Sequence, residues 1–282
     1  MKLITYESNG QIRTGALGTN DTSTMIDVTS AGTALQIATD AVARAKADAL
    51  LASGAASEAV PASVLTPFAP HAIICIGLNY MDHCRETNSP VPTRPVIFGK
   101  FANSIVGPND TVSWYGDASS EVDYEAELGV VIGKPCYRVS ESDALSYIGG
   151  YTCVNDISAR DIQLSDSGKQ WILGKTFDGF CPIGPALVTA DEIADPQALE
   201  IKCILNGQEV QHSNTREMIF NVAVLISHLS KFMTLNPGDL IATGTPFGVG
   251  MSRTPKLWLK DGDVVTVEIE KVGALTNTTR VL

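Results

Sequence analysis

A β-rich α+β fold is predicted for this 282-residue chain by the balance of its apolar patterns. Short apolar runs typical of strands outnumber runs with helical spacing, and the two kinds do not alternate regularly along the chain. Regular alternation would favour a doubly wound parallel sheet, which is therefore not expected. A hydrophobic content of 44% and a charged content of 18% are those of an ordinary globular protein rather than a disordered one.

The first quarter of the chain is expected to hold short strands and one surface helix. Residues 1–29 contain brief apolar runs, and Asn9-Gly10 is a dipeptide typical of a hairpin turn. Residues 33–52 are rich in alanine and other helix formers, which predicts a helix. Residues 53–70 combine Gly, Ser, Ala and three prolines, which predicts a linker.

This linker divides the chain into a small N-terminal domain over residues 1–65 and a larger domain over residues 70–282 that contains all the candidate site residues. Within the larger domain, hydrophobic periodicity, turn dipeptides and capping residues each predict an element. The expected elements are a buried strand over 73–77, a helix after Ser140 capped by Ser140 and Asp143, a hairpin around Asn206-Gly207, a helix within 217–232, and strands over 240–242 and 264–269.

Acidic residues exceed basic ones, 31 against 20, which gives a net charge of −11. Nucleic acids and anionic membranes require a basic surface, so neither is expected as a partner. No apolar run is long enough to cross a membrane, and the first residues are typical of neither a signal peptide nor a transit sequence. The six cysteines are scattered without a Cys-x-x-Cys pair, as in reduced proteins, so a cytoplasmic location is expected.

Three carboxylates form the most informative pattern. Glu125 and Glu127 alternate with apolar residues, so on a strand they share one face. Asp156 follows a second apolar stretch. Close carboxylates repel each other unless a cation lies between them, and an all-oxygen ligand set suits Mg²⁺, Mn²⁺ or Ca²⁺ rather than zinc. Solvated surface acids are the alternative interpretation.

Two further segments carry candidate catalytic groups. If the residues after Gly77 form a helix, His83 and Glu86 share one face, where the carboxylate can orient the imidazole; a surface ion pair is the alternative. Lys175 lies in an apolar, aromatic segment. There it could stabilise an enolate electrostatically, form a Schiff base, or extend toward solvent.

Candidate substrate contacts come from two other segments. Arg160 and Gln163 are three residues apart, and arginine is suited to a bidentate grip on a carboxylate. An ion pair between Arg160 and one of the chain's many acids is the alternative. Thr245 lies in a glycine-rich loop after a strand, and such a loop can hold an anion with its backbone N–H groups. The loop lacks the Walker and dinucleotide-binding patterns.

Taken in series, these segments resemble the fumarylacetoacetate hydrolase family. The resemblance runs from about Ile73 to Asn277 and is carried by Gly-Leu-Asn-Tyr-x-x-His-x-x-Glu (77–86), Phe-Gly-Lys (98–100), Asp-Tyr-Glu-Ala-Glu-Leu (123–128), Asn-Asp-Ile-Ser-Ala-Arg-Asp-x-Gln (155–163), Gly-Lys-Thr-Phe-Asp (174–178) and Thr-Gly-Thr-Pro-x-Gly-Val-Gly (243–250). Segments 84–92 and 180–185 are most similar to the family's "domain-containing protein 2" branch.

The resemblance implies a mixed β-sandwich roll for the larger domain and, usually, a homodimer. It implies that the metal, Mg²⁺ or Mn²⁺, is held by Glu125, Glu127 and Asp156. It implies a catalytic dyad of His83 and Glu86 on a lid, and a catalytic lysine, Lys175. The residues expected to contact the substrate are Tyr80, Lys100, Arg160, Gln163 and Thr245.

Members of this family catalyse several reactions, so the reaction is inferred from the site. Our first hypothesis is that a small 2-oxo acid binds the metal, and that His83 activates a water that cleaves the C–C bond of a 2,4-dioxo acid to give a 2-oxo acid and a carboxylic acid. The alternative is keto–enol tautomerisation or decarboxylation of oxaloacetate at the same metal site. A non-catalytic binding protein is a third interpretation. Specificity is expected to come from residues 80–95, 113–120 and 164–170.

Overall fold

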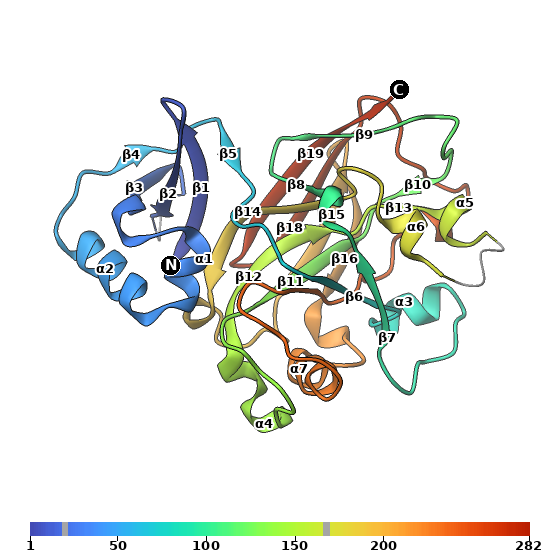
Figure 1. The fold of residues 1–282 in the computed structure, drawn as a ribbon. Helices are drawn as coiled ribbons and strands as arrows, with labels where there is room; N and C mark the ends of the chain where they lie inside the picture. The colour runs from blue at the N-terminus through green and yellow to red at the C-terminus, as the bar shows by residue number, and fades with distance from the viewer. Residues whose placement is uncertain (19–21, 166–169) are drawn as a thin grey trace.

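Two mixed β-sheets that pack face to face form the body of the protein, with short helices at their edges (Figure 1). The computed structural model describes residues 1–18, 22–165 and 170–282. In spatial order, the large sheet contains β4 (Glu58–Ala59), β3 (Thr24–Asp27), β2 (Gln11–Leu17), β1 (Lys2–Ser8), β14 (Cys181–Thr189), β12 (Ile148–Asn155), β11 (Ala126–Ile132), β17 (Leu240–Ala242), β6 (Ile73–Gly77) and β7 (Val96–Lys100). Beside β1 lies β5 (Val64–Leu65), and beside β14 lies β8 (Ile105–Val106).

The second sheet contains, in spatial order, β16 (Gln208–Asn214), β15 (Glu200–Leu205), β18 (Val264–Ile269), β19 (Gly273–Val281) and β9 (Thr111–Trp114). A separate short pair joins β10 (Val122–Asp123) to β13 (Ser158–Ala159). The helices are α1 (Ala34–Thr39), α2 (Ala41–Ala52), α3 (Met81–Glu86), α4 (Glu141–Ala144), α5 (Arg160–Gln163), α6 (Ile172–Lys175) and α7 (Val222–Ser230). The predicted α+β sandwich is confirmed.

Local sequence explains most of these boundaries. Both predicted hairpin turns are present, and both of their Asn-Gly pairs have positive φ: 51° and 73° at Asn9-Gly10, and 51° and 79° at Asn206-Gly207. That is the geometry a two-residue turn needs between right-twisted strands. The Ser140 side chain accepts a hydrogen bond from the backbone N–H of Asp143 at the start of α4, as predicted.

Two expectations for the N-terminal part are wrong. The single helix over residues 33–52 is two helices, because Asp40 is extended and its side chain caps α2 by accepting from the Ala43 N–H. The predicted linker over residues 53–70 contains two short strands, β4 and β5, which pair with β3 and β1. Strands of two residues have no sequence pattern of their own, because their partners define them.

The main core lies between β11, β12 and β14 of the large sheet and β15, β18 and β19 of the second. The strand alternation predicted around the two glutamates is confirmed. One set of alternate residues lies in this core: Tyr124, Ala126, Leu128, Val130 and Ile132. Val131, which has the opposite parity, lies in a second cluster on the other face of the sheet.

The N-terminal segment has a small core of its own, which includes Leu3, Ala34 and Ile37. It also continues the large sheet, because Lys2 and Leu3 of β1 pair with Val188 and Leu187 of β14. The division into domains at residues 65–70 stays a prediction.

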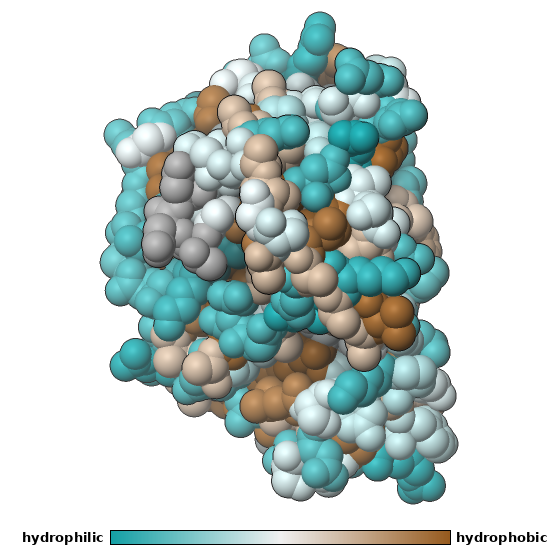
Figure 2. All heavy atoms as spheres, turned by 90° about the vertical axis from the view of Figure 1, so that its left-hand side faces the viewer, coloured by the Kyte–Doolittle hydropathy of each residue, from teal (hydrophilic) through white to brown (hydrophobic). Residues whose placement is uncertain are grey.

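The face of the protein on the side of the N-terminal segment is mostly hydrophilic, with small hydrophobic patches (Figure 2). Within the described residues, none of the helices has the length and apolarity needed to span a membrane.

Candidate active site

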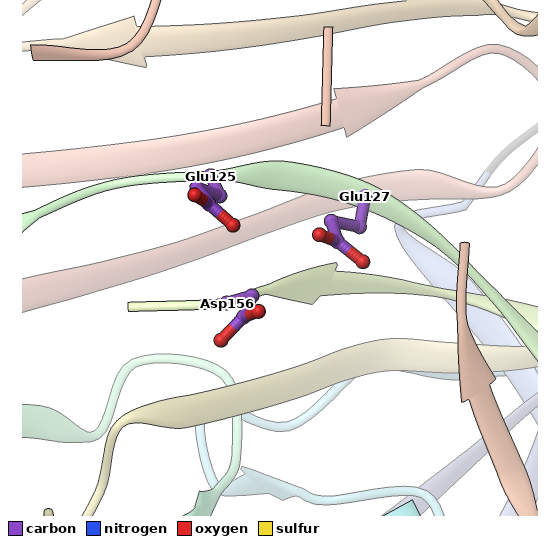
Figure 3. A group of neighbouring side chains, drawn as sticks. All are labelled: Glu125, Glu127 and Asp156. Atoms are coloured by element: carbon purple, nitrogen blue, oxygen red, sulfur yellow. The ribbon is translucent and has the colours of Figure 1, made fainter. Parts of the chain in front are cut away.

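The three predicted carboxylates lie together, buried, where two neighbouring strands meet (Figure 3). Glu125 precedes β11, Glu127 lies on it, and Asp156 directly follows β12. Because β11 and β12 are antiparallel, these positions are brought side by side, and the Asp156 N–H donates to the Glu125 carbonyl oxygen at 2.9 Å. One carboxylate oxygen from each residue lies within 4.8 Å of the others. The alternative of solvated surface acids is therefore wrong.

Buried cations surround two of these acids. Lys175 Nζ lies 2.8 Å from Glu125 Oε2 and 2.9 Å from Asp156 Oδ2. Arg160 lies 2.7 Å from the other Glu125 oxygen, and Lys100 forms an ion pair with Asp156. Burial raises the pKa of Glu125, but Lys175 and Arg160 outweigh it and lower that pKa to about 2. Glu125 is therefore ionised at neutral pH.

Glu127 is the exception among the three. It is 1% exposed and accepts a hydrogen bond from the Gly244 N–H at 2.9 Å. Burial, together with Asp156 and Glu125, raises its pKa well above the ordinary value. No lysine or arginine of the described chain forms an ion pair with it. A buried carboxylate that faces two others without a cation fits a bound divalent metal, so the three residues could hold one.

Lys175 is fully enclosed, so its extension toward solvent is ruled out. Burial lowers the pKa of its ammonium group, but Asp156 and Glu125 outweigh it and leave that pKa raised. Nζ also lies 5.1 Å from the centre of the Phe98 ring. A charged lysine in this position is an electrostatic group; a Schiff base would require the neutral amine.

His83 and Glu86 lie on α3, as predicted, and they are largely buried. The His83 Nδ1–H donates to Glu86 Oε2 at 3.0 Å, and the other Glu86 oxygen accepts from the Gly248 N–H at 2.8 Å. The alternative of a surface ion pair is therefore wrong. His83 lines the cavity described next, and no hydrogen bond of its second imidazole nitrogen, Nε2, is found within the described chain.

A cavity of about 310 Å³ lies beside the carboxylates. The predicted site residues that line it are His83, Glu125, Glu127, Arg160, Gln163, Lys175 and Thr245. Two hydroxyl residues, Thr87 and Ser89, also line it, as do apolar side chains that include Phe98 and Trp171. Residues as distant in sequence as 83 and 245 therefore face one space.

Two predicted substrate contacts, Tyr80 and Lys100, do not line this cavity. Lys100 donates to Asp156 and to the Ile157 carbonyl oxygen, so its charge is used behind the carboxylate. The Tyr80 hydroxyl is buried and lacks a hydrogen-bond partner within the described chain. Lys100 therefore supports Asp156 from behind, and the substrate contacts expected of Lys100 and Tyr80 stay predictions.

The three segments expected to determine specificity differ in whether they line the cavity. Thr87 and Ser89 from segment 80–95 line the cavity, and so does Leu164. Positions 166–169 lie outside the described residues, and no described residue of 113–120 reaches the lining.

Sequence reasoning missed the residues that position the predicted ones. Asp123 is fully buried; it accepts from Arg160 Nε at 2.9 Å and from the backbone N–H groups of Gly250 and Met251. The Gln211 side chain links Thr245 Oγ1 to the Ala126 N–H. The spacing of Asp123, two residues before Glu125, was the available signal; Gln211 gave none.

Comparison with known proteins gives concordant matches. The family described as fumarylacetoacetate (FAA) hydrolase, C-terminal, matches residues 72–280. An oxaloacetate tautomerase, fahd2, mitochondrial, from Xenopus laevis is 56% identical over 216 residues, which cover 76% of this chain and 67% of that protein. The chain thus spans about two thirds of the length of that relative.

Two solved structures match over essentially the whole chain. A fumarylacetoacetate hydrolase from Exiguobacterium antarcticum has a TM-score of 0.87 at 33% identity, covering 100% of both chains. A maleylpyruvate hydrolase from Sphingobium sp. SYK-6, solved with manganese(II) and pyruvate, has a TM-score of 0.82 at 28% identity and covers 99% of both chains. Each resembles this chain in the two-sheet fold and not only in the segments around the acids.

The comparison also corrects the expected cytoplasmic location. The relative from Xenopus laevis is mitochondrial, and so are similar oxaloacetate tautomerases from Bos taurus and Homo sapiens. Scattered reduced cysteines are compatible with either compartment, so they did not support the narrower inference.

The family match over residues 72–280, with the grouped carboxylates and the shared fold, shows that this chain belongs to the fumarylacetoacetate hydrolase family.

Proposed function

We propose that this protein is a divalent-metal-dependent tautomerase that interconverts the keto and enol forms of oxaloacetate. The observation that carries the proposal is Glu127, a buried carboxylate without a cation partner among the described residues, in the same cavity as His83, Arg160 and Lys175. The substrate is suggested by the names of the relatives, which are oxaloacetate tautomerases. Those relatives favour this alternative over our first hypothesis of C–C hydrolysis.

The metal would be held by Glu125, Glu127 and Asp156, whose oxygens suit Mg²⁺ or Mn²⁺. When bound, such an ion supplies positive charge that stabilises an enolate. The lysines and Arg160 neutralise much of the remaining negative charge, so the acids can stay ionised in a buried site.

The chain's own residues would perform the proton transfer. Arg160 and Gln163 are hydrogen-bonded to each other at 2.9 Å at the cavity wall, where they would orient the substrate carboxylate. The Lys175 ammonium would stabilise the negative charge that develops on the 2-oxo oxygen. His83 Nε2 would carry the proton between C3 and the 2-oxo oxygen, with Glu86 fixing the ring.

Hydrolysis of a 2,4-dioxo acid is the second candidate. It is supported by the maleylpyruvate hydrolase, whose fold this chain shares at lower identity. The two reactions differ in one requirement, because hydrolysis needs a water that attacks the distal carbonyl and tautomerisation does not. His83 would then activate that water instead of exchanging a proton with C3.

An NMR assay with Mg²⁺ present distinguishes the candidates, with oxaloacetate and acetylpyruvate offered in parallel. The proposal predicts faster enol–keto exchange of oxaloacetate without cleavage of acetylpyruvate. Acetate and pyruvate from acetylpyruvate, with oxaloacetate exchange at its spontaneous rate, would establish the hydrolase instead. Pyruvate and carbon dioxide from oxaloacetate would indicate a decarboxylase.

A further inference from the structure

The cavity beside the carboxylates has an aromatic wall in addition to its charged groups. We propose that the protein also interconverts the keto and enol forms of arylpyruvates, which are 2-oxo acids with an aromatic group at C3. This inference rests on the proposed function, because the same proton transfer is applied to a substrate with a different C3 substituent.

The wall is built from Phe98 and Trp171. Their rings pack edge to face with centroids 5.5 Å apart. Lys175 Nζ lies 5.1 Å from the centre of the Phe98 ring. The aromatic wall is therefore next to the charged residues of the cavity. A third ring from a substrate could join this arrangement with an edge-to-face or offset contact.

Gly77 at the end of β6 makes room for the indole. A Cβ atom at this position would collide with the Trp171 ring, so only glycine lets the ring lie against the strand. Leu78, Leu164 and Met251 extend the apolar lining. The wall is therefore built into the backbone and is not a chance contact of one side chain.

The space available exceeds what oxaloacetate needs. The cavity of about 310 Å³ reaches the lower end of the about 300–1,000 Å³ typical of pockets that hold drug-sized ligands. A neighbouring cavity of about 340 Å³ shares Phe98, Gln163, Leu164 and Trp171 with it, so both cavities border the wall. An aromatic substituent at C3 would remove this apolar surface from water, which the carboxylate at C3 of oxaloacetate cannot do.

The charges of the lining do not require a second carboxylate on the substrate. Each lining residue that can carry positive charge among those described is already paired with an acid: His83 with Glu86, Arg160 with Asp123 and Glu125, and Lys175 with Glu125 and Asp156. Arg160 and Gln163 would orient the first carboxylate of either substrate, and the second carboxylate of oxaloacetate would meet hydroxyl groups of the lining such as those of Thr87 and Ser89. An arylpyruvate carries only the first carboxylate.

The proposed step is balanced without any co-reactant. In the keto-to-enol direction, the C3–H bond breaks and its electron pair forms the C2–C3 double bond, while the π pair of the 2-oxo C=O bond moves to the oxygen. The proton that His83 removes from C3 is then delivered to that oxygen, so no proton is gained or lost overall. His83 Nε2 accepts the C3 proton, and the reverse direction returns it to C3.

The test measures the enol-to-keto rate of phenylpyruvate and of oxaloacetate over their spontaneous rates, with the Mg²⁺-loaded full chain. Wild type is expected to accelerate both. Trp171→Ala should lower kcat/KM for phenylpyruvate about 10- to 100-fold more than for oxaloacetate, mainly through KM, because an apolar contact is lost. Gly77→Ala should act in the same direction by displacing the indole. Phe232→Ala, at an exposed aromatic residue that does not line the cavity, should change neither rate.

Each contrary outcome has one meaning. Acceleration of oxaloacetate with phenylpyruvate at its spontaneous rate would overturn this inference and leave the proposed function standing. Wild type accelerates phenylpyruvate in a second possible outcome, but Trp171→Ala and Gly77→Ala reduce its rate no more than they reduce the rate of oxaloacetate. That outcome would overturn the assignment of the wall. If neither acid is accelerated, the proposed function itself fails, and this inference fails with it.

Discussion

Glu86 joins His83 to the glycine-rich loop: one of its oxygens accepts from the imidazole Nδ1–H at 3.0 Å, and the other accepts from the Gly248 N–H at 2.8 Å. Helix α3 and the loop that carries Thr245 are thus held by one carboxylate. Two further contacts attach α3 to its surroundings, a hydrogen bond from Ser213 to Asp82 and an ion pair between Arg85 and Glu217 at 3.0 Å. The position of the proposed base therefore depends on the loop as well as on its own helix.

Replacement of the proposed base tests its role directly. His83→Ala should lower kcat for oxaloacetate tautomerisation by about 10²–10⁴-fold, the usual contribution of a positioned general base. Metal binding should persist, because His83 is not one of the three residues that could hold the metal. Stopped-flow rates and calorimetric Mn²⁺ titration check both parts. An unchanged kcat would remove His83 from the mechanism.

The bridging carboxylate can be tested separately. A glutamine side chain has one neutral oxygen, so it cannot replace both ionised oxygens that accept from His83 and Gly248. Glu86→Gln should therefore lower kcat by about tenfold, which corresponds to the loss of one charge-assisted hydrogen bond. Glu217→Gln is the matched control, because that acid pairs with Arg85 at the surface, and exposed pairs contribute little. Equal effects of the two substitutions would contradict the bridging role.

Glu127 should have opposite effects on stability with and without metal. In metal-free protein, Glu127→Gln should raise stability by about 1–3 kcal/mol, because it removes a buried carboxylate that lacks a cation partner in the described chain. Wild type should gain thermal stability with Mn²⁺, as any protein does with a ligand of the native state, and the variant should not.

Thermal unfolding of both proteins, with EDTA and with saturating Mn²⁺, measures these effects. Glu209→Gln, at an exposed glutamate of β16, is the control and should respond to Mn²⁺ as wild type does. A variant that retains the full stabilisation by Mn²⁺ would show that Glu127 is not a ligand.

Asp123 is expected to position Arg160 rather than to contact substrate. It is fully buried and accepts from Arg160 Nε, Gly250 N–H and Met251 N–H. Asp123→Asn breaks a buried ion pair, so the free energy of unfolding should fall by about 3–5 kcal/mol, and KM for oxaloacetate should rise. Urea unfolding and steady-state kinetics provide the measurements. A rise in KM without loss of stability would instead place Asp123 in contact with the substrate.

The grouping of the acidic side chains could be predicted from the sequence because strand alternation is a local property. Glu125 and Glu127 share a parity, and the residues of the opposite parity along the same stretch lie in the main core. The pairing of Arg160 with Asp123, and the burial of Lys100 behind Asp156, join positions from different elements. No local pattern encodes such contacts.

The wall of Phe98 and Trp171 was missed for the same reason, since its two rings come from β7 and from the residue before α6. The short strands β4 and β5 exist only through their partners. The homodimer implied by the family resemblance stays a prediction, which light scattering on the purified protein would test.

The most direct test of the account is the enol-to-keto rate of oxaloacetate with metal-stripped protein, titrated with Mg²⁺ or Mn²⁺. If Glu127 holds an essential metal, the rate should be spontaneous in EDTA, rise saturably on addition of either ion, and show no acceleration with Glu127→Gln at any tested concentration. Full acceleration in EDTA, or the same metal response in wild type and Glu127→Gln, would contradict it.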